Sequence, residues 1–249
     1  MSTTVATRLV AHLQPVTAGA QIADVRIGLG YSAVRLSTGE VGLSWTPKEE
    51  ARCCQQFGEA GTLVGRPAGD LLGWLERPDA LRRMLGLATA NALGVRLAPA
   101  PATGADVIGL LGLEPADHLV MVGHFGPLLP PIRKTGCRLQ IVEAEPDGEE
   151  LGPEEGRQAL GRCSVAIITA TSLVTGGLEG YLEALGPVRA AVLLGPSVPL
   201  FPEVFRGSRL THLAGSRVVD GARVLQIVSE GGGTPTLKVH LEAVIVPVG

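Results

Sequence analysis

The chain contains 249 residues with a formal net charge of -3; 45% of its residues are hydrophobic and only 3% are aromatic. This length suffices for two modest cores, and the composition predicts aliphatic cores of the kind found in sheets covered by helices. The basic residues are scattered and the aromatic residues few, so nucleic acid is not expected as a partner. Residues 1–14 lack the order of a signal peptide, and the uncharged stretch at 163–178 is too short and polar to span a membrane. We therefore expect a cytoplasmic protein without membrane contact.

Four cysteines occur, and none of them forms a C-x-x-C pair. Cys53 and Cys54 are adjacent, a geometry that suits neither a mutual disulfide nor a zinc site. Cys137 and Cys163 stand apart from them and from each other. In a reducing compartment we expect all four to be free thiols.

In chain order, the first half predicts a small sheet with helices packed on one side. Residues 21–46 alternate apolar and polar side chains on either side of a Ser-Thr-Gly turn, which is typical of a β-hairpin. One helix is expected at Pro47, with Thr46 as its cap, and two more begin near Pro67 and Pro78.

The pattern changes after residues 99–104, which are rich in Pro and Ala and predict a linker. Short apolar runs now alternate with helical segments that begin near Pro153 and Leu178, and this alternation predicts a parallel sheet buried on both faces. The runs lie at 118–123, 138–144, 164–171 and 190–197. Ligands of open α/β sheets lie outside the carboxyl ends of the strands, so we expect the functional site in the loops after these runs.

Those loops resemble consecutive motifs of the putative heavy-metal chelation family. The similar segments are MVGHFGP (121–127), IVEAEP (141–146), ITATSLVTGGLE (168–179) and LLGPSVPLFP (193–202). Further similar segments lie at 213–221 and 229–234 and, in the first half, at 25–34, 41–45 and 85–93. The resemblance covers nearly the whole chain in the right order, which makes chance a poor explanation.

The resemblance implies an α/β protein with a small enolase-N-terminal-like α+β domain at residues 1–98 and a Rossmann-like parallel-sheet domain at residues 105–249. It also implies a ligand pocket in the cleft between these domains. The residue patterns alone predict a compatible two-part α/β architecture. The chain departs from the family where Thr175 and Gly177 replace the usual Asn and Thr, and where His124 replaces an aromatic residue. A changed pocket can mean a changed ligand.

His124 and Glu143 are the predicted catalytic and metal-ligating residues. His124 follows the first strand of the large sheet, where it can act as a metal ligand or as a general acid/base. Glu143 ends the second strand, where it can bind a ribose hydroxyl, a cation or an amino group, and we expect it to be the nearest partner of His124. The structural alternatives are a solvent-facing loop histidine and a strand-end carboxylate that accepts a backbone hydrogen bond.

The predicted ligand-binding residues are mainly serines and threonines with hydroxyl groups, glycines, and one asparagine with a side-chain amide. Hydroxyls in the third loop, beside two glycines, suit an anionic or carbonyl-bearing ligand, although one of them can instead cap the helix near Leu178. Ser197 is expected over the cleft, and Asn91 can reach across the domain boundary or cap its own helix. The complete set is Asn91, Gly123, Phe125, Thr169, Thr171, Ser172, Thr175, Gly195, Pro196 and Ser197.

Tightly bound NAD or ATP is not expected. The loop after the first strand is not G-x-G-x-x-G, and Pro127, Pro130 and Pro131 delay any helix that would receive a pyrophosphate. No motif of a permanent structural metal site occurs. A divalent or heavy-metal ion is expected to arrive with the ligand or to use His124 and Glu143 with open positions, and spacing alone makes a metal site at His212 and Asp220 a weak prediction.

The sequence is compatible with more than one class of function. The first is a protein that binds a small molecule or metal chelate in an interdomain pocket, with a role in heavy-metal handling. The second is an enzyme that acts on a small polar metabolite, or its metal complex, in the same cleft with His124 as acid/base. A third is an enzyme that uses a nucleotide in a non-standard way. A pocket with His, Glu and hydroxyl groups is compatible with either of the first two classes of function. The sequence is also compatible with a homodimer.

Overall fold

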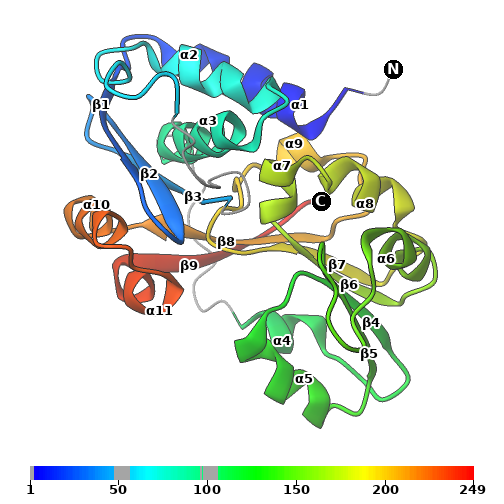
Figure 1. Ribbon diagram of the computed structural model, residues 1–249. Coiled ribbons are helices and arrows are strands. Elements are labelled where there is room, and N and C mark those ends of the chain that lie inside the picture. Colours follow the sequence, from blue (N-terminus) through cyan, green and yellow to red (C-terminus); the bar gives the residue numbers. More distant parts are fainter. Residues whose placement is uncertain (1–2, 48–56, 96, 98–105) are drawn as a thin grey trace.

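A computed structural model describes residues 3–47, 57–95, 97 and 106–249. It contains one three-stranded sheet and one six-stranded sheet, each with helices packed against it (Figure 1). The predicted mixed α/β fold is therefore confirmed. The predicted division into residues 1–98 and 105–249 stays a prediction, because the expected linker and the helix expected after Pro47 lie outside the described residues.

The small sheet is an antiparallel meander of β1 (Ile22–Ile27), β2 (Tyr31–Leu36) and β3 (Val41–Trp45). The hairpin predicted around residues 37–39 is confirmed by the antiparallel pairing of β2 and β3, but its expected first strand is two strands, because the chain reverses twice. The first reversal lies at residues 28–30, where the Gly28 N–H donates to the Tyr31 carbonyl at 3.0 Å. A Cβ at Gly28 would lie 2.2 Å from a backbone oxygen of the helix at Val228, so only glycine fits there.

Helices cover one face of this small sheet. They are α1 (Val5–Leu13), α2 (Ala68–Leu72) and α3 (Ala80–Gly94), with the 3-10 turns η1 (Gln14–Thr17) and η3 (Gly73–Glu76). The helices predicted near Pro67 and Pro78 correspond to α2 and α3. The Asp79 side chain caps α3 by accepting a hydrogen bond from the Arg82 N–H.

The large sheet contains β4 (His118–Val122), β5 (Arg138–Val142), β6 (Val165–Thr169), β7 (Ala190–Leu194), β8 (His212–Val218) and β9 (Leu241–Pro247). Its strand order is β5-β4-β6-β7-β8-β9, with all neighbours parallel except β8 and β9. The four predicted apolar runs are confirmed as β4 to β7. The order reverses between β4 and β6, which is the position where doubly wound sheets place a crevice for ligands.

Two layers of helices cover this large sheet (Figure 1). On one face, α4 (Val107–Leu111) and α5 (Leu129–Lys134), which follows η4 (Gly126–Leu128), form a core with β4 and β6. On the other face lie α6 (Pro153–Leu160), α7 (Thr171–Thr175), α8 (Leu178–Ala184) and α9 (Pro202–Phe205). The same strands are thus buried on both sides, as their continuous apolar sequence predicts.

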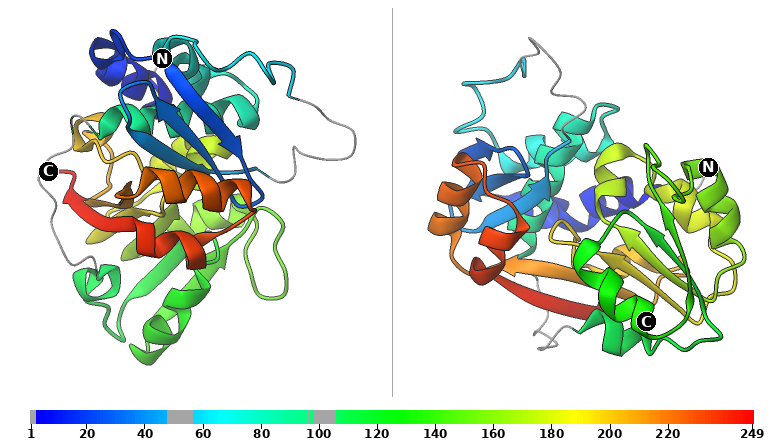
Figure 2. Two further views of the ribbon diagram at one scale, coloured as in Figure 1. Left: turned by 90° about the vertical axis from the view of Figure 1, so that its left-hand side faces the viewer. Right: turned by 60° about the horizontal axis from the view of Figure 1, so that its bottom comes forward.

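The second half of the chain also packs against the small sheet. Between β8 and β9 the chain forms α10 (Gly221–Ser229), α11 (Thr234–Leu237) and η5 (Lys238–His240). Helix α10 contacts β1 and β2 (Figure 2), and the Tyr31 hydroxyl is 2.9 Å from the Thr234 hydroxyl. The small sheet is consequently enclosed between α3 and α10, although α10 comes from the other end of the chain.

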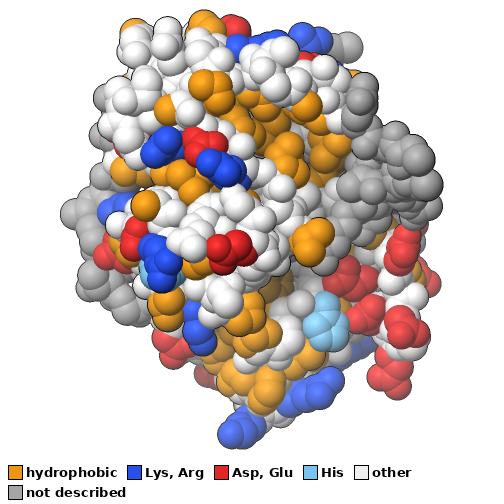
Figure 3. Space-filling view, turned by 60° about the vertical axis from the view of Figure 1, so that its left-hand side comes forward, with side chains coloured by type: hydrophobic (Ala, Val, Ile, Leu, Met, Phe, Trp, Pro, Cys, Tyr) orange, Lys and Arg blue, Asp and Glu red, His pale blue; other side chains and the backbone are white. Residues whose placement is uncertain are grey.

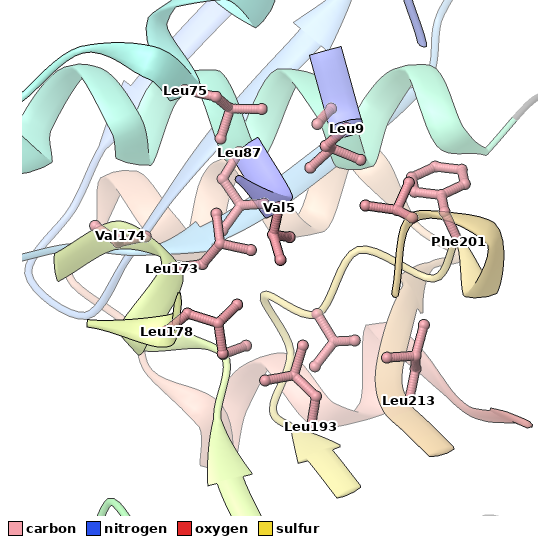
Figure 4. Close-up of a cluster of buried hydrophobic side chains, with 14 of the residues drawn as sticks. Val5, Leu9, Leu75, Leu87, Leu173, Val174, Leu178, Leu193, Phe201 and Leu213 are labelled. Carbon is pink, nitrogen blue, oxygen red and sulfur yellow. The ribbon is translucent and has the colours of Figure 1, made fainter. Parts of the chain in front are cut away.

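One hydrophobic core joins the two halves. Side chains from α1 and α3 meet side chains from α7, α8 and the large sheet in a single buried cluster (Figure 4). The labelled members are Val5, Leu9, Leu75, Leu87, Leu173, Val174, Leu178, Leu193, Phe201 and Leu213. At the carboxyl end of α3, a Cβ on Gly94 would lie 2.2 Å from the Phe201 ring. The halves are therefore in direct van der Waals contact.

The described cysteines agree with the expected free thiols. Cys137 and Cys163 are unpaired, whereas Cys53 and Cys54 lie outside the described residues. Burial raises the pKa of the Cys163 thiol to about 11, so this side chain is a neutral core residue at pH 7.

Candidate functional site

The loops after β4 and β6 touch at the point where the strand order reverses. Gly123, directly after β4, has a φ of 94°, and a Cβ on it would lie 2.9 Å from the Thr169 Cβ at the end of β6. A glycine is needed here both for its backbone conformation and for this close approach. The two predicted loops are thus adjacent at the carboxyl edge of the sheet.

A cavity of about 330 Å³ opens along this edge on the α4 and α5 side of the sheet. Three predicted ligand-binding residues line it, namely Phe125, Gly195 and Pro196. The other lining residues are Asp106, Val107, Pro127, Leu128, Leu194, Ala214, Gly215, Ser216, Ala243 and Val244. Most of these side chains are apolar, and the volume suits a small organic ligand.

Helix α4 and strands β8 and β9 also contribute to this cavity, which the sequence did not predict. Nothing in the sequence marks residues 241–247 as the edge strand beside β8. Only the antiparallel pairing of these strands, with Gly215 opposite Val244, brings the carboxyl-terminal residues to the cavity wall.

Asn91 and Ser197 join the two halves of the molecule. The Asn91 amide donates to the Leu43 carbonyl at 2.8 Å and to the Ser197 carbonyl at 3.1 Å, so it reaches across the boundary instead of capping α3. The Ser197 hydroxyl accepts from the Trp45 N–H at 2.8 Å, and the residue is 2% exposed. Ser197 is therefore buried in the contact between the halves. The sequence predicted that it would lie over an open cleft.

A second, much smaller pocket lies beside these hydrogen bonds. It is lined by Leu43 and Asn91 from the first half and by Pro196 and Ser216 from the second, and it holds about 30 Å³. This volume accommodates one or two water molecules. The larger cavity adjoins it, because Pro196 and Ser216 line both.

His124 is held by Glu150, although the sequence predicted Glu143 as its nearest partner. The His124 side chain is 49% exposed, and its Nδ1 donates to the Glu150 carboxylate at 3.0 Å. This hydrogen bond is the main reason why the pKa of Glu150 lies below its ordinary value. With Nδ1 engaged by a carboxylate, Nε2 remains to bind a ligand, as in histidines that coordinate metals.

The path of the chain explains this change of partner. After β5 the chain leaves the sheet and returns, and the Leu151 N–H then donates to the Ile141 carbonyl at 2.8 Å. This return places Glu150 beside the loop after β4. On the face of the molecule drawn in Figure 3, acidic side chains gather at one side.

Glu143 lies instead near α6 and α8. Its backbone N–H donates to the Leu151 carbonyl, and its charge raises the pKa of Tyr181 while the Arg157 charge lowers it. Burial is the largest cause of the raised Tyr181 pKa. Sequence reasoning assigned no role to Tyr181 or Arg157, because their approach to the end of β5 depends on how the two helices pack.

The hydroxyls of the third loop stabilise an unpredicted helical turn, α7. The Ser172 hydroxyl donates to the Thr169 carbonyl at 2.6 Å, and the Thr169 and Thr171 hydroxyls lie 3.1 Å apart. Gly176, with a φ of 84°, ends α7, and α8 then begins at Leu178 as predicted. Of these hydroxyl residues, Ser172 is buried and Thr175 is exposed.

No preformed metal cluster exists among the residues that the structure describes, since no three His, Cys, Asp or Glu side chains are grouped to hold an ion. The weakly predicted pair of His212 and Asp220 cannot share one metal. The two residues lie at opposite ends of β8, roughly 20 Å apart at about 3.3 Å per residue. Asp220 instead caps α10.

The fold and the site together define a two-sheet α/β protein with a ligand-sized cavity at the carboxyl edge of its large sheet. The chain belongs to the family described as "Putative heavy-metal chelation". Two family models with this description match it, one over residues 11–94 and the other over residues 106–247.

Three proteins of other sources are similar to this chain, one by sequence and two by solved structure. An uncharacterized protein of Methanocaldococcus jannaschii is 25% identical over 215 residues, which cover 82% of each chain. A protein of unknown function from Pyrococcus horikoshii has a TM-score of 0.86 at 18% identity, covering 98% of this chain and all of the other. One from Desulfitobacterium hafniense has a TM-score of 0.79 at 22% identity, covering 96% and 98%. These structures show that the fold is shared.

Within the described part of the chain, the helices are all too short or too polar to cross a membrane.

Proposed function

We propose that this protein binds a small molecule or a metal chelate in the cavity at the carboxyl edge of the large sheet. The main support for this proposal is the cavity of about 330 Å³ beside the strand-order reversal, which Phe125 and Pro196 line. Both residues were predicted from the loops that resemble the family. The description of the matching family supports a role in handling heavy metals.

The chemistry of the cavity favours a chelate over a bare ion. Its wall is mostly apolar, and the described residues include no cluster of three metal ligands. A metal held here would therefore bring most of its ligands with it, and its organic part would contact the apolar wall. His124, the chain neighbour of Phe125, can add one ligand through Nε2. Glu143 is not part of this proposal, because it lies near α6 and α8, whereas the cavity opens on the α4 and α5 side of the sheet.

Tightly bound NAD is no part of this proposal. Proline occupies the first turn of both η4 and α5, and α5 is only six residues long. A pyrophosphate would thus lack the long helix N-terminus that receives it in dinucleotide-binding sheets.

The decisive experiment is native mass spectrometry of the purified protein with elemental analysis, followed by calorimetric titration with Ni²⁺ alone and with its citrate complex. We expect the complex to bind more tightly than the bare ion. Phe125→Ala, which removes an apolar wall, should weaken binding of the complex by at least about tenfold. Phe57→Ala, far from this cavity, is the matched control. Equal affinity of Phe125→Ala and the unaltered protein for the complex would contradict the proposal.

The hydrogen bond between His124 and Glu150 supports a second proposal, an enzyme that uses His124 as acid/base. A carboxylate that orients a histidine is the arrangement found in many general acid/base pairs. Incubating the protein with the molecule that co-purifies distinguishes the proposals. A change in the mass of that molecule, absent with His124→Ala, would indicate catalysis; an unchanged mass would leave binding alone.

A further inference from the structure

A second ligand-sized cavity lies at the opposite edge of the large sheet, beneath α6. Its volume is about 390 Å³, and it is lined mainly by polar side chains. The lining residues are His118, Arg138, Gln140, Leu151, Glu155, Gln158, Ala159 and Arg162. None of the motifs that resemble the family contributes a predicted site residue to it.

The strand register explains why this cavity is polar. His118 of β4 lies opposite Arg138 of β5, and alternate residues of each strand face the same side. On the side of α6 the strands are therefore polar at their amino ends, with His118, Arg138 and Gln140. They become apolar at their carboxyl ends, where Val142 belongs to the core.

Helix α6 covers the apolar ends of these strands more closely than their polar ends. At Gly156 it packs so closely on β5 that a Cβ would lie 2.3 Å from the Val142 side chain. Gln158, near the end of the helix, and Arg162, two residues beyond its last residue, both line the cavity. The helix thus seals the apolar part of the sheet edge and leaves the polar part open to solvent.

Several positively charged groups and hydrogen-bond donors in this cavity have no acceptor among the other lining side chains. Arg138 forms no side-chain hydrogen bond or ion pair with any residue that the structure describes, and Arg162 forms one, to the Gln158 carbonyl at 3.4 Å. Glu155, the one acidic lining residue, accepts from the Gly152 N–H at the start of α6.

The hydrogen bond between His118 and Gln140 adds a further donor. The His118 Nε2 and the Gln140 Oε1 lie 2.6 Å apart, so the glutamine oxygen accepts and its amide N–H₂ group remains to donate. Two arginines, both exposed to solvent, and an amide donor therefore line the same cavity, and an anion with several oxygen atoms can accept hydrogen bonds from all of them.

We propose that this cavity binds an oxyanion, a phosphate or carboxylate group of a small metabolite, between Arg138 and Arg162. The site is separate from the cavity near Phe125, because β4 spans about 13 Å between its two ends. Its occupation does not depend on the function proposed for that cavity.

The test is titration of the full-length protein with inorganic phosphate and, separately, with malonate, observed through the arginine Nε–H signals by NMR and through thermal melting. We expect the Arg138 and Arg162 signals to shift and the melting temperature to rise with the anion that binds. Arg138→Gln and Arg162→Gln should each weaken this binding by at least about tenfold. The arm that responds identifies the phosphate or the carboxylate source.

Arg133→Gln is the matched control, because it removes the same charge from an exposed position at the end of α5. Melting curves of all variants without anion show whether each still folds. The proposal is overturned if neither anion shifts the two arginine signals at millimolar concentration, or if Arg133→Gln loses as much affinity as the cavity variants.

Discussion

At the scale of single residues, His124 illustrates how a loop residue acquires a candidate role. Gly123 holds the chain in a conformation with positive φ directly before it, and Glu150 binds its Nδ1 from a segment that returns to the sheet. The imidazole is therefore oriented before any ligand arrives, and less entropy remains to be lost on binding.

We expect His124→Ala to leave folding nearly intact, because the side chain is about half exposed and supports little core. Binding of a chelate, or turnover, should weaken by at least about tenfold through the loss of one ligand or charge-assisted hydrogen bond. Thermal melting combined with the Ni²⁺-citrate titration measures both effects. His212→Ala, at the amino edge of the sheet, serves as control, and unchanged binding in the His124 variant would assign that residue to the solvent-facing loop alone.

A different polar group, Asp117, has a structural role at the amino edge. Its carboxylate accepts from the Arg189 guanidinium, from the Ser164 hydroxyl at 2.8 Å and from the Glu114 N–H at 2.9 Å. The residue is 8% exposed. The hydrogen bond from Arg189 is the main reason why the pKa of Asp117 lies well below its usual range.

This lowered pKa predicts how stability depends on pH. The unfolded chain takes up a proton near the ordinary pKa of 3.8 while the folded protein stays ionised, so the contribution of Asp117 is fully present above that pH and is lost progressively as the pH falls from there toward the lower pKa of the folded state. Asp117→Asn should lower stability at pH 7 by about 1.5–3 kcal/mol, the range for hydrogen bonds to charged groups. Urea unfolding at pH 7 and pH 3 checks this expectation. A deficit that is no smaller at pH 3 would count against it.

At the scale of elements, the packing of α3 on the small sheet depends on one glycine. A Cβ on Gly42 of β3 would lie 2.1 Å from the Ala88 carbonyl oxygen and 2.2 Å from the Ala92 nitrogen. Both of these atoms are backbone, so a side chain at this position forces the whole helix to move away from the strand.

Gly42→Ala should therefore destabilise the protein by at least about 2 kcal/mol, as expected for overpacking of a rigid contact. Gly73→Ala is the matched control, because Gly73 has a helical φ of -61° and nothing within 4 Å of its added Cβ. That control should be neutral or slightly stabilising. Chemical denaturation of the two variants provides the comparison, and equal stabilities would show that α3 can shift freely.

The elements differ in how well the sequence predicted them. Strands β4 to β7 were predicted because continuous apolar runs mark strands that are buried on both faces. The sequence predicts one hairpin where the structure has a three-stranded meander, because the turn at residues 28–30 lies within a stretch of alternating residues. Helix α1 and strand β9 were not predicted, and each makes most of its contacts with elements distant in the sequence.

At the scale of the whole molecule, the common core predicts cooperative unfolding. The buried cluster includes Leu9 of α1 together with Leu193 and Leu213 of the large sheet. In addition, the Asn91 side chain donates hydrogen bonds to a carbonyl in each half. Exposing the core of either half thus removes contacts from the other.

We expect a single unfolding transition in urea. Both tryptophans, Trp45 and Trp74, lie in the first half, so their fluorescence reports on that half, whereas far-UV circular dichroism reports on the whole chain. The two curves should have the same midpoint. An earlier fluorescence midpoint would show that the first half unfolds independently.

The candidate site was predicted from the sequence only in part. Phe125, Gly195 and Pro196 were assigned to it from the general position of ligands in parallel sheets, and the structure places all three on the wall of one cavity. The sequence did not identify Glu150 as the partner of His124, nor Ser216 and Val244 as wall residues. Those positions depend on a returning segment and on an antiparallel edge strand.

The sequence by itself determined the α/β class, the parallel strands and the edge at which ligand loops gather, because periodicity and strand burial are local properties of the chain. The tertiary structure decided which side chains meet. It buried Ser197 between the halves, hydrogen-bonded Asn91 to both of them, paired His124 with Glu150 and opened a polar cavity beneath α6. The physical reason is that contacts between residues far apart in the chain depend on how helices and strands pack, which no local pattern of residues records.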